Sequence, residues 1–132
     1  MSADHGQVVL DASAVLALLR AESGAEQVEP VLQGAMLSTV NGAEVAQKIS
    51  AHGSDGAWAL SELRELGVNM VAFTSEDALA AAALWPHTRT SGLSLGDRAC
   101  LALAQRMNCP ALTADQAWKD CELGDIEIRL IR

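Results

Sequence analysis

The stretch VVLDASAVLALL, residues 8–19, sets the fold that the rest of the chain must fit. It opens with a short β-branched and apolar run and continues as small and apolar residues typical of a helix. Asp11 stands at the junction, beside small residues instead of on a charged face. The stretch therefore predicts a buried strand, an acidic side chain at its end, and a helix over about residues 13–21.

Similar strand-like runs recur and alternate with helical patterns. After residues 8–10 they lie at 36–40, 68–73, 109–114 and 126–131. The first four are largely continuous in apolar character, as in strands buried on both faces of a parallel sheet, whereas IEIRLI alternates and predicts an edge strand. This alternation predicts one three-layer α/β domain over residues 1–132. We expect helices at 13–21, 24–33, 42–52, 55–66, 76–85 and 96–107, with a short turn from 115.

Several helix starts carry the spacing of a capping box, in which a side chain satisfies an otherwise unpaired backbone N–H. The three pairs are Asn41 with Glu44, Ser94 with Asp97, and Thr113 with Gln116. The path of residues 42–66 stays open, because a simple helical hairpin would return the chain to the wrong edge of the sheet before the strand at 68–73.

Composition narrows the functional classes. With one Phe, three Trp and no Tyr, the core must be built from Ala, Val and Leu. A net charge of −8 argues against a general nucleic-acid coat, although bound cations would cancel part of that charge in a nuclease.

The three cysteines lack CxxC spacing and are interpreted as reduced core residues. The polar MSADHGQ start has no signal-peptide core, and no apolar run approaches the roughly 20 residues of a membrane span, so a cytoplasmic protein is expected.

Four acids stand where an apolar run ends or a helix begins: Asp11, Glu44, Asp97 and Asp115. Parallel strands end at one edge, where the following helices begin, so the first two acids and Asp115 are expected on one rim. Asp97 joins them only if residues 86–95 climb back along the preceding helix. These residues can span at most about 33 Å, and an 11-residue helix is only about 16 Å long, so the climb is feasible.

Each acid also has a structural explanation, because Asp and Glu are favoured in the first turn of a helix. Glu76 and Asp77 are interpreted in this way. Four carboxylates about 5 Å apart, however, would repel by about 3 kcal/mol per pair at an effective dielectric of 20. A fold gains nothing from that arrangement without a cation. Because all the candidate ligands are oxygens, Mg²⁺ or Mn²⁺ is favoured over Zn²⁺.

The chain resembles the PIN domain, in particular the VapC-like ribonuclease toxins of bacterial toxin-antitoxin pairs. The matching words are VVLDASAVLALL, S-x-x-x-x-x-E from Ser38 to Glu44, LSLGDRACLALA around Asp97 and LTADQAW around Asp115, and they cover almost the whole chain. The resemblance implies a three-layer fold whose parallel sheet of about five strands has the order 3-2-1-4-5. It also implies that the four acids line a pocket that binds Mg²⁺ or Mn²⁺ and hydrolyses RNA.

The predicted function is therefore that of a metal-dependent endoribonuclease, the toxin of a VapBC-type system. Asp11 and Asp97 would hold the most central ion, and Glu44 and Asp115 would complete its shell directly or through water. An enzyme using Asp11 as a phosphoryl-accepting nucleophile is disfavoured, because Ser13 stands where a phosphatase needs a second Asp. A catalytically silent PIN-like module that binds RNA or protein is the remaining alternative.

Other side chains lie close in sequence to the acids. Ser13 and Thr113 could orient the neighbouring carboxylates, although capping explains them equally well. Arg98 and Arg89 could hold a substrate phosphate or an antitoxin carboxylate, or could simply be solvated. A basic rim around the pocket would also draw on Arg20, Lys48 and Lys119. Residues without ligand spacing, interpreted as surface side chains, are His5, His52 and His87.

The family resemblance also implies two protein partners, a cognate antitoxin that covers the acidic pocket and a second copy of the toxin in a homodimer. The Ala-rich helix at 76–85 and the apolar faces of 42–66 are compatible with such interfaces. Core packing explains the same residues at least as well, so the interfaces stay open.

Overall fold

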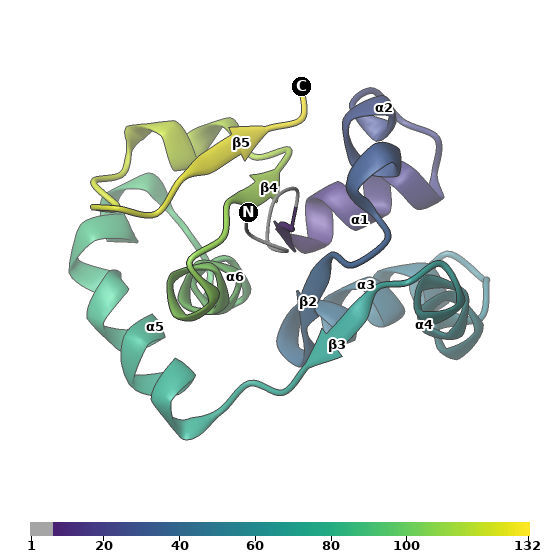
Figure 1. Ribbon diagram of the computed structural model, residues 1–132, viewed down its shortest axis with the longest axis horizontal. Coiled ribbons are helices and arrows are strands. Elements are labelled where there is room, and N and C mark those ends of the chain that lie inside the picture. The colour runs from purple at the N-terminus through teal and green to yellow at the C-terminus, as the bar shows by residue number, and fades with distance from the viewer. Residues whose placement is uncertain (1–6) are drawn as a thin grey trace, which may run out of the picture.

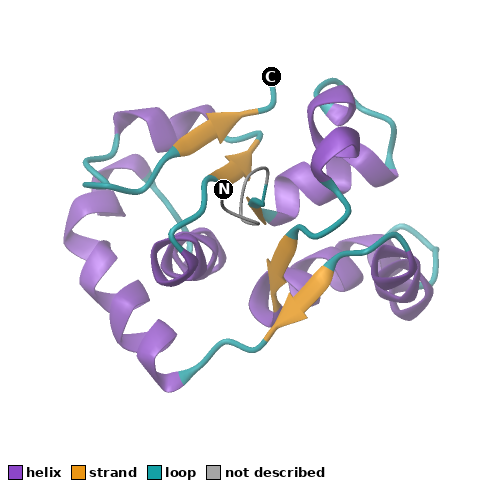
Figure 2. Cartoon of the chain, in the orientation of Figure 1, coloured by secondary structure: helices purple, strands orange, loops and turns teal. Residues whose placement is uncertain are grey.

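The computed structural model describes residues 7–132 and contains a five-stranded, all-parallel sheet. Its strand order is β3-β2-β1-β4-β5, which confirms the predicted α/β fold. The central strand β1 pairs with β2 through Val9 and Met36, and with β4 through Val9 and Ala111. The strands are β1 (Val9–Leu10), β2 (Met36–Ser38), β3 (Asn69–Val71), β4 (Ala111–Thr113) and β5 (Ile128–Leu130) (Figures 1 and 2).

Helices cover both faces of the sheet, and each face buries its own hydrophobic core (Figure 1). Successive side chains of a strand point to opposite faces, so Val8 and Leu10 enter one core and Val9 the other. The first core is covered by α1 (Ala12–Leu19), α2 (Ala25–Val28), α3 (Thr39–Ala51) and α4 (Gly56–Glu65). The second is covered by α5 (Ser75–Thr88) and α6 (Leu95–Met107). These are the three layers that the sequence predicts.

Strand β3 and the helix expected at 24–33 differ from the sequence prediction. Burial on both faces holds for β1, β2 and β4 but is wrong for β3, where Asn69 is exposed because β3 is an edge strand with β2 as its neighbour. The other edge is β5, as predicted. The helix expected at 24–33 is divided into α2 and a 3-10 helix, Glu29–Val31, that contains Pro30. Proline has no backbone N–H to continue an α-helical ladder.

The start of α3 is earlier than predicted. Ser38 caps the helix, and its Oγ accepts a hydrogen bond from the backbone N of Val40 at 3.3 Å. The predicted capping box of Asn41 and Glu44 is therefore wrong. Ser38, Thr39 and Val40 belong to the expected strand but cap or begin the helix, so Asn41 lies inside it. Asn41 is also fully buried.

The other two predicted capping boxes have opposite outcomes. In α6 the box of Ser94 and Asp97 is confirmed, since each residue's side chain accepts a bond from the other's backbone N–H. The turn after β4 is a 3-10 helix, Gln116–Asp120, and Asp115 caps it by accepting from the backbone N of Ala117 at 2.9 Å. Thr113 instead ends β4, so the third box is wrong.

The path between β2 and β3 is resolved by a crossing of two helices. In Figure 1, α4 is seen end-on whereas α3 lies across the view, so the two do not form a simple antiparallel pair. A Cβ on Gly56 would overlap the carbonyl group of Ala46, which shows how closely the helices approach. After α4 the carbonyl of Gly67 accepts a bond from the N of Gly34 at 2.9 Å. The chain has thus returned to the amino edge of β2 before β3 begins.

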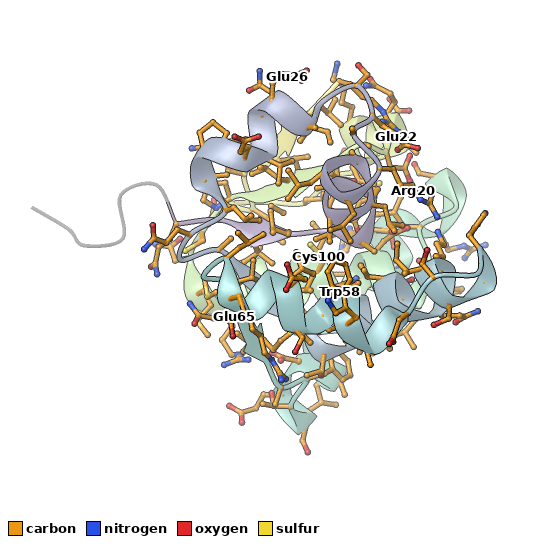
Figure 3. The ribbon with its side chains drawn as sticks, turned by 90° about the vertical axis from the view of Figure 1, so that its right-hand side faces the viewer. Arg20, Glu22, Glu26, Trp58, Glu65 and Cys100 are labelled. Atoms are coloured by element: carbon orange, nitrogen blue, oxygen red, sulfur yellow. The ribbon has the colours of Figure 1, made fainter. Side chains whose placement is uncertain are left out.

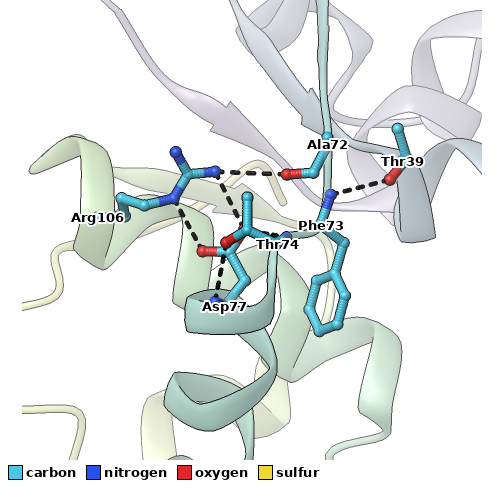
Figure 4. Close-up of polar contacts among 6 residues, drawn as sticks. All are labelled: Thr39, Ala72, Phe73, Thr74, Asp77 and Arg106. Atoms are coloured by element: carbon cyan, nitrogen blue, oxygen red, sulfur yellow. Dashed lines mark hydrogen bonds and ion pairs between the residues drawn. The ribbon is translucent and has the colours of Figure 1, made fainter.

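An ion pair joins the start of α5 to the end of α6 (Figure 4). Arg106 donates from Nε and Nη2 to the two carboxylate oxygens of Asp77, at 2.8 and 3.0 Å, and from Nη2 to the carbonyl of Ala72 at 3.4 Å. Asp77 also forms a capping box with Thr74, which confirms its predicted capping role. Burial opposes ionisation of Asp77, but the bonds from Arg106 and Thr74 outweigh it and hold its pKa below the usual value. The contact fixes α6, which carries Asp97.

No helix within residues 7–132 is both long and apolar enough to cross a membrane. Cys100 and Cys109 are buried as predicted, and Cys121 is half-buried; none forms a disulfide. His52 and His87 are exposed, as predicted, whereas His5 lies outside the described residues.

Candidate active site

The ends of β1 and β4 are joined at Asp11. Its backbone N donates to the carbonyl of Leu112 at 2.9 Å, and its side chain is only 3 % exposed. One oxygen, Oδ2, accepts bonds from the hydroxyls of Ser13 at 2.6 Å and Thr113 at 2.8 Å. Ser13 Oγ in turn accepts from the backbone N of Ala114 at 2.9 Å. Two segments about a hundred residues apart thus hold one buried carboxylate in place.

Asp115 lies two residues beyond β4, on the same edge of the sheet. Its backbone N donates to Thr113 Oγ1 at 3.1 Å, so the hydroxyl that supports Asp11 also contacts the backbone of Asp115. Asp97 reaches this edge on the first turn of α6, where its Oδ2 accepts from the backbone N of Ser94 at 2.9 Å. The loop before α6 therefore makes the predicted climb.

Glu44 comes from α3 and lies against the start of α6. Asn41, one turn earlier in α3, donates from Nδ2 to Glu44 Oε1 at 2.9 Å and from the same nitrogen to the carbonyl of Gly96 at 2.9 Å. The Glu44 carboxylate occupies the space that a Cβ on Gly96 would need. The Glu44 carboxylate is thereby held against Gly96, the residue that precedes Asp97 in α6.

The electrostatics link the four acids into one cluster. Burial raises the pKa of Asp11 to about 6; the hydroxyls of Ser13 and Thr113 partly oppose this, and the charges of Asp97 and Glu44 add to it. Burial also raises the pKa of Asp97, against its bonds to Ser94, and the charge of Asp115 raises it further. The charges of Asp97 and Glu44 thus act on Asp11, and the charge of Asp115 acts on Asp97, so the four carboxylates lie near one another.

Cys100 lies beneath this cluster, on the second turn of α6. Burial raises the pKa of its thiol well above the usual value, and the negative charges of Asp11, Asp97 and Glu44 raise it further. The charges of Asp11, Asp97 and Glu44 thus all reach one thiol, as expected of acids that lie close together. Its complete burial among apolar residues makes it a core side chain.

Each of the four carboxylates is held through one oxygen. The hydrogen-bonded atoms are Asp11 Oδ2, Glu44 Oε1, Asp97 Oδ2 and Asp115 Oδ1. The second oxygen of each makes no hydrogen bond to the part of the chain that the structure describes, residues 7–132. Oxygen atoms of this kind are the donors that Mg²⁺ and Mn²⁺ prefer.

The carboxylates do not form a closed cage. No group of three or more His, Cys, Asp or Glu side chains among residues 7–132 is arranged to hold an ion. Mg²⁺ usually keeps several waters and uses one or two carboxylates, so the donor set fits an ion bound through few direct contacts.

The basic side chains are less organised than the acids. Arg98 donates from Nη1 to the carbonyl of Ala81 at 2.9 Å, and Arg89 lies 4.9 Å from the ring centre of Trp85, so both guanidinium groups contact α5. Among the described residues, neither forms an ion pair with one of the four acids. Lys48, one turn after Glu44, is the cation whose charge lowers the pKa of Asp97. Lys119 is exposed on the 3-10 helix after Asp115.

Asn41 and Gly96 are site residues that sequence reasoning missed. The spacing of Asn41 and Glu44 did signal an interaction, but it was interpreted as a helix cap. The signal for Gly96 was a glycine inside a helical pattern, where a close packing contact is the usual explanation.

The family of the chain follows from a match over most of its length. A model of the PIN domain matches residues 8–122, and the chain belongs to this family. No curated protein sequence matches it.

Solved structures from several bacteria share the fold. A toxin-antitoxin complex from Klebsiella pneumoniae matches with a TM-score of 0.73 and 16% identity, over 95% of this chain and 98% of that one. VapBC2 from Rickettsia felis, bound to a promoter DNA fragment, matches with a TM-score of 0.69 and 14% identity, over 94% and 98%. VapBC-1 from nontypeable Haemophilus influenzae matches with 0.67 and 16%, over 95% and 98%. Identities this low show a common fold and no more.

Proposed function

We propose that this protein is a Mg²⁺- or Mn²⁺-dependent endoribonuclease and acts as the toxin of a VapBC-type toxin-antitoxin pair. The observation that carries the proposal is the cluster of four carboxylates from four separate segments, each held through one oxygen, with the pKa of Asp11 raised to about 6. PIN domains are in general nucleases, which supports a hydrolytic role for this cluster.

The four acids would act as ligands and not as nucleophiles. Asp11 and Asp97 would hold the central ion, and Glu44 and Asp115 would complete its shell directly or through water. When bound, such an ion lowers the pKa of a water and offsets the charge of a phosphodiester under attack. Ser13 and Thr113 keep Asp11 oriented, because both hydroxyls donate to the same oxygen.

A cognate antitoxin and a second copy of the chain are the proposed protein partners. The structures that share the fold include toxin-antitoxin complexes, which supports the first of these. The chain also exposes large apolar side chains, among them Trp58 at 62% on α4, on the face shown in Figure 3. Side chains of this kind are enriched at protein interfaces.

RNA cleavage with matched variants tests the proposal. The purified protein should cleave single-stranded RNA with Mn²⁺ or Mg²⁺ and lose this activity with a chelator. Asp11→Asn and Asp97→Asn should each lower the cleavage rate by more than about 100-fold while the fold is kept. Asp125→Asn, which changes an exposed acid, is the control and should cleave normally. Full activity in both site variants would refute the assignment, and binding of RNA without cleavage would favour the catalytically silent module.

A further inference from the structure

We propose that Asn41 and Gly96 are positioning residues that hold the Glu44 carboxylate against the first turn of α6 and so set its place relative to Asp97. The inference rests on the proposed function, since it concerns the same acidic cluster. It assigns a task to two uncharged residues whose hydrogen bonds reach Glu44 and each other but not the remaining three acids.

Asn41 acts as a bridge between two helices that are distant in sequence. Its Nδ2 donates to Glu44 Oε1 within α3 and to the carbonyl of Gly96 in α6, both at 2.9 Å. One amide group thus uses both of its N–H bonds, and Oε2 of Glu44 is left without a hydrogen bond among the described residues. The bridge orients the carboxylate and ties it to α6 in the same contact.

The burial of Asn41 indicates that the two hydrogen bonds of this bridge are the reason for a polar residue at this position. The residue is fully buried, and its Oδ1 has no hydrogen-bond partner within residues 7–132. A buried acceptor left without a partner is unfavourable, so an apolar side chain would fill this position better if packing were the only requirement. The two bonds donated by Nδ2 are the compensating interaction.

Gly96 supplies the space that the carboxylate needs. It is the second residue of α6, where alanine would favour the helix more than glycine does. A Cβ built on it would overlap three atoms of Glu44, the carboxyl carbon and both oxygens, and no backbone atom lies among them. The glycine therefore lets a negative group approach the positive end of the helix dipole, one residue before Asp97.

Gly96→Ala separates positioning from folding. The three atoms nearest to the added methyl group all belong to the flexible end of Glu44, so we expect the carboxylate to move and the backbone to stay. We expect the metal-free variant to unfold at the same temperature as the parent protein or higher. Its affinity for Mn²⁺, measured by calorimetric titration, should fall by about 10- to 100-fold, as for other residues that orient metal ligands. Asn41→Ala should show a similar loss of affinity, and Gln105→Ala, an exposed amide near the other end of α6, should show none.

A double-mutant cycle then tests whether the effect passes through Glu44. In a Glu44→Gln background, Gly96→Ala should change Mn²⁺ affinity by less than about twofold, because the ligand it displaces is already altered. An undiminished effect in that background, an unchanged affinity in Gly96→Ala alone, or a lower unfolding temperature of that variant would each overturn the inference. Absence of Mn²⁺ binding by the parent protein would overturn the proposed function, and this inference with it.

Discussion

Replacing Asp11 with Asn should make the metal-free protein more stable at neutral pH. The Asp11 carboxyl has a folded-state pKa of about 6 against an ordinary value of 3.8, with burial as the main cause. At about 1.4 kcal/mol per pKa unit, ionising it in the folded protein costs about 3 kcal/mol. An uncharged Asn of the same shape avoids that cost, and its Oδ1 can still accept the bonds from Ser13 and Thr113.

The sign of the pH dependence follows from proton binding. Between about pH 4 and pH 6 the folded parent protein keeps a proton on Asp11 that the unfolded chain has lost, so its stability falls as the pH rises. The amide introduced by Asp11→Asn has no proton to lose in this range, hence the substitution removes this part of the slope. The stability difference should therefore be small near pH 3.5, grow through pH 6 and level off above it at about 1 to 3 kcal/mol.

Urea unfolding followed by tryptophan fluorescence from pH 3.5 to 8 gives this difference directly. For a domain of this size about 3 kcal/mol corresponds to a rise in midpoint temperature on the order of 10 °C. Asp125→Asn is the matched control, because an exposed acid has no burial cost to remove. A difference between Asp11→Asn and the parent protein that does not change between pH 4 and pH 7 would refute the reasoning.

Three further outcomes are expected. Arg106→Ala should lower the free energy of unfolding at pH 7 by about 2 kcal/mol, because buried Asp77 loses charged hydrogen bonds. Since the folded-state pKa of Asp77 is lowered, this loss should shrink only as the pH falls through that pKa, and a pH-independent loss in urea titrations would contradict the account. Gly56→Ala should destabilise the protein by about 1 to 3 kcal/mol, because the added Cβ meets the carbonyl of Ala46. This cost should exceed the gain from the better helix propensity of Ala. Equal or higher stability of the variant in the same urea titrations would contradict this expectation. Mn²⁺ at about a hundred times its Kd should stabilise the parent protein by about 2.7 kcal/mol in thermal scans but stabilise Asp97→Asn much less, and equal shifts would argue against Asp97 as a ligand.

The α/β class and the parallel sheet were predictable from local signals, whereas the strand order came from the resemblance to the PIN domain. Apolar runs such as residues 8–10 and 109–114 report burial on both faces of a sheet, and the order of strands and helices then restricts the topology. The same logic placed Asp11 and Asp115 on one edge, since each acid follows a strand in the interior of the sheet. The box of Ser94 with Asp97 was also predictable from four consecutive residues.

Features that depend on distant contacts were not predictable. The pairing of Arg106 with Asp77 joins residues 29 positions apart, and nothing local distinguishes this Arg from the exposed ones. The role of Asn41 was misread because its spacing from Glu44 suits both a cap and an interaction within a helix. The crossing of α3 over α4 depends on the contact of Gly56 with Ala46, which only the folded chain reveals.

The two separate cores have a mechanical consequence for the acidic cluster. Asp11 directly precedes α1 and Glu44 lies in α3, two helices anchored in one core, whereas Asp97 lies in α6, which is anchored in the other, so the cluster spans the boundary between the two cores. A displacement of α6 relative to α1 and α3 by about an ångström would separate Asp97 from Asp11 and would stretch the bond from Asn41 to the carbonyl of Gly96, and misplacement on that scale can reduce catalysis about a hundredfold. Substitutions that repack either core, far from the acids, should therefore lower the activity of the protein while its secondary structure and solubility are kept.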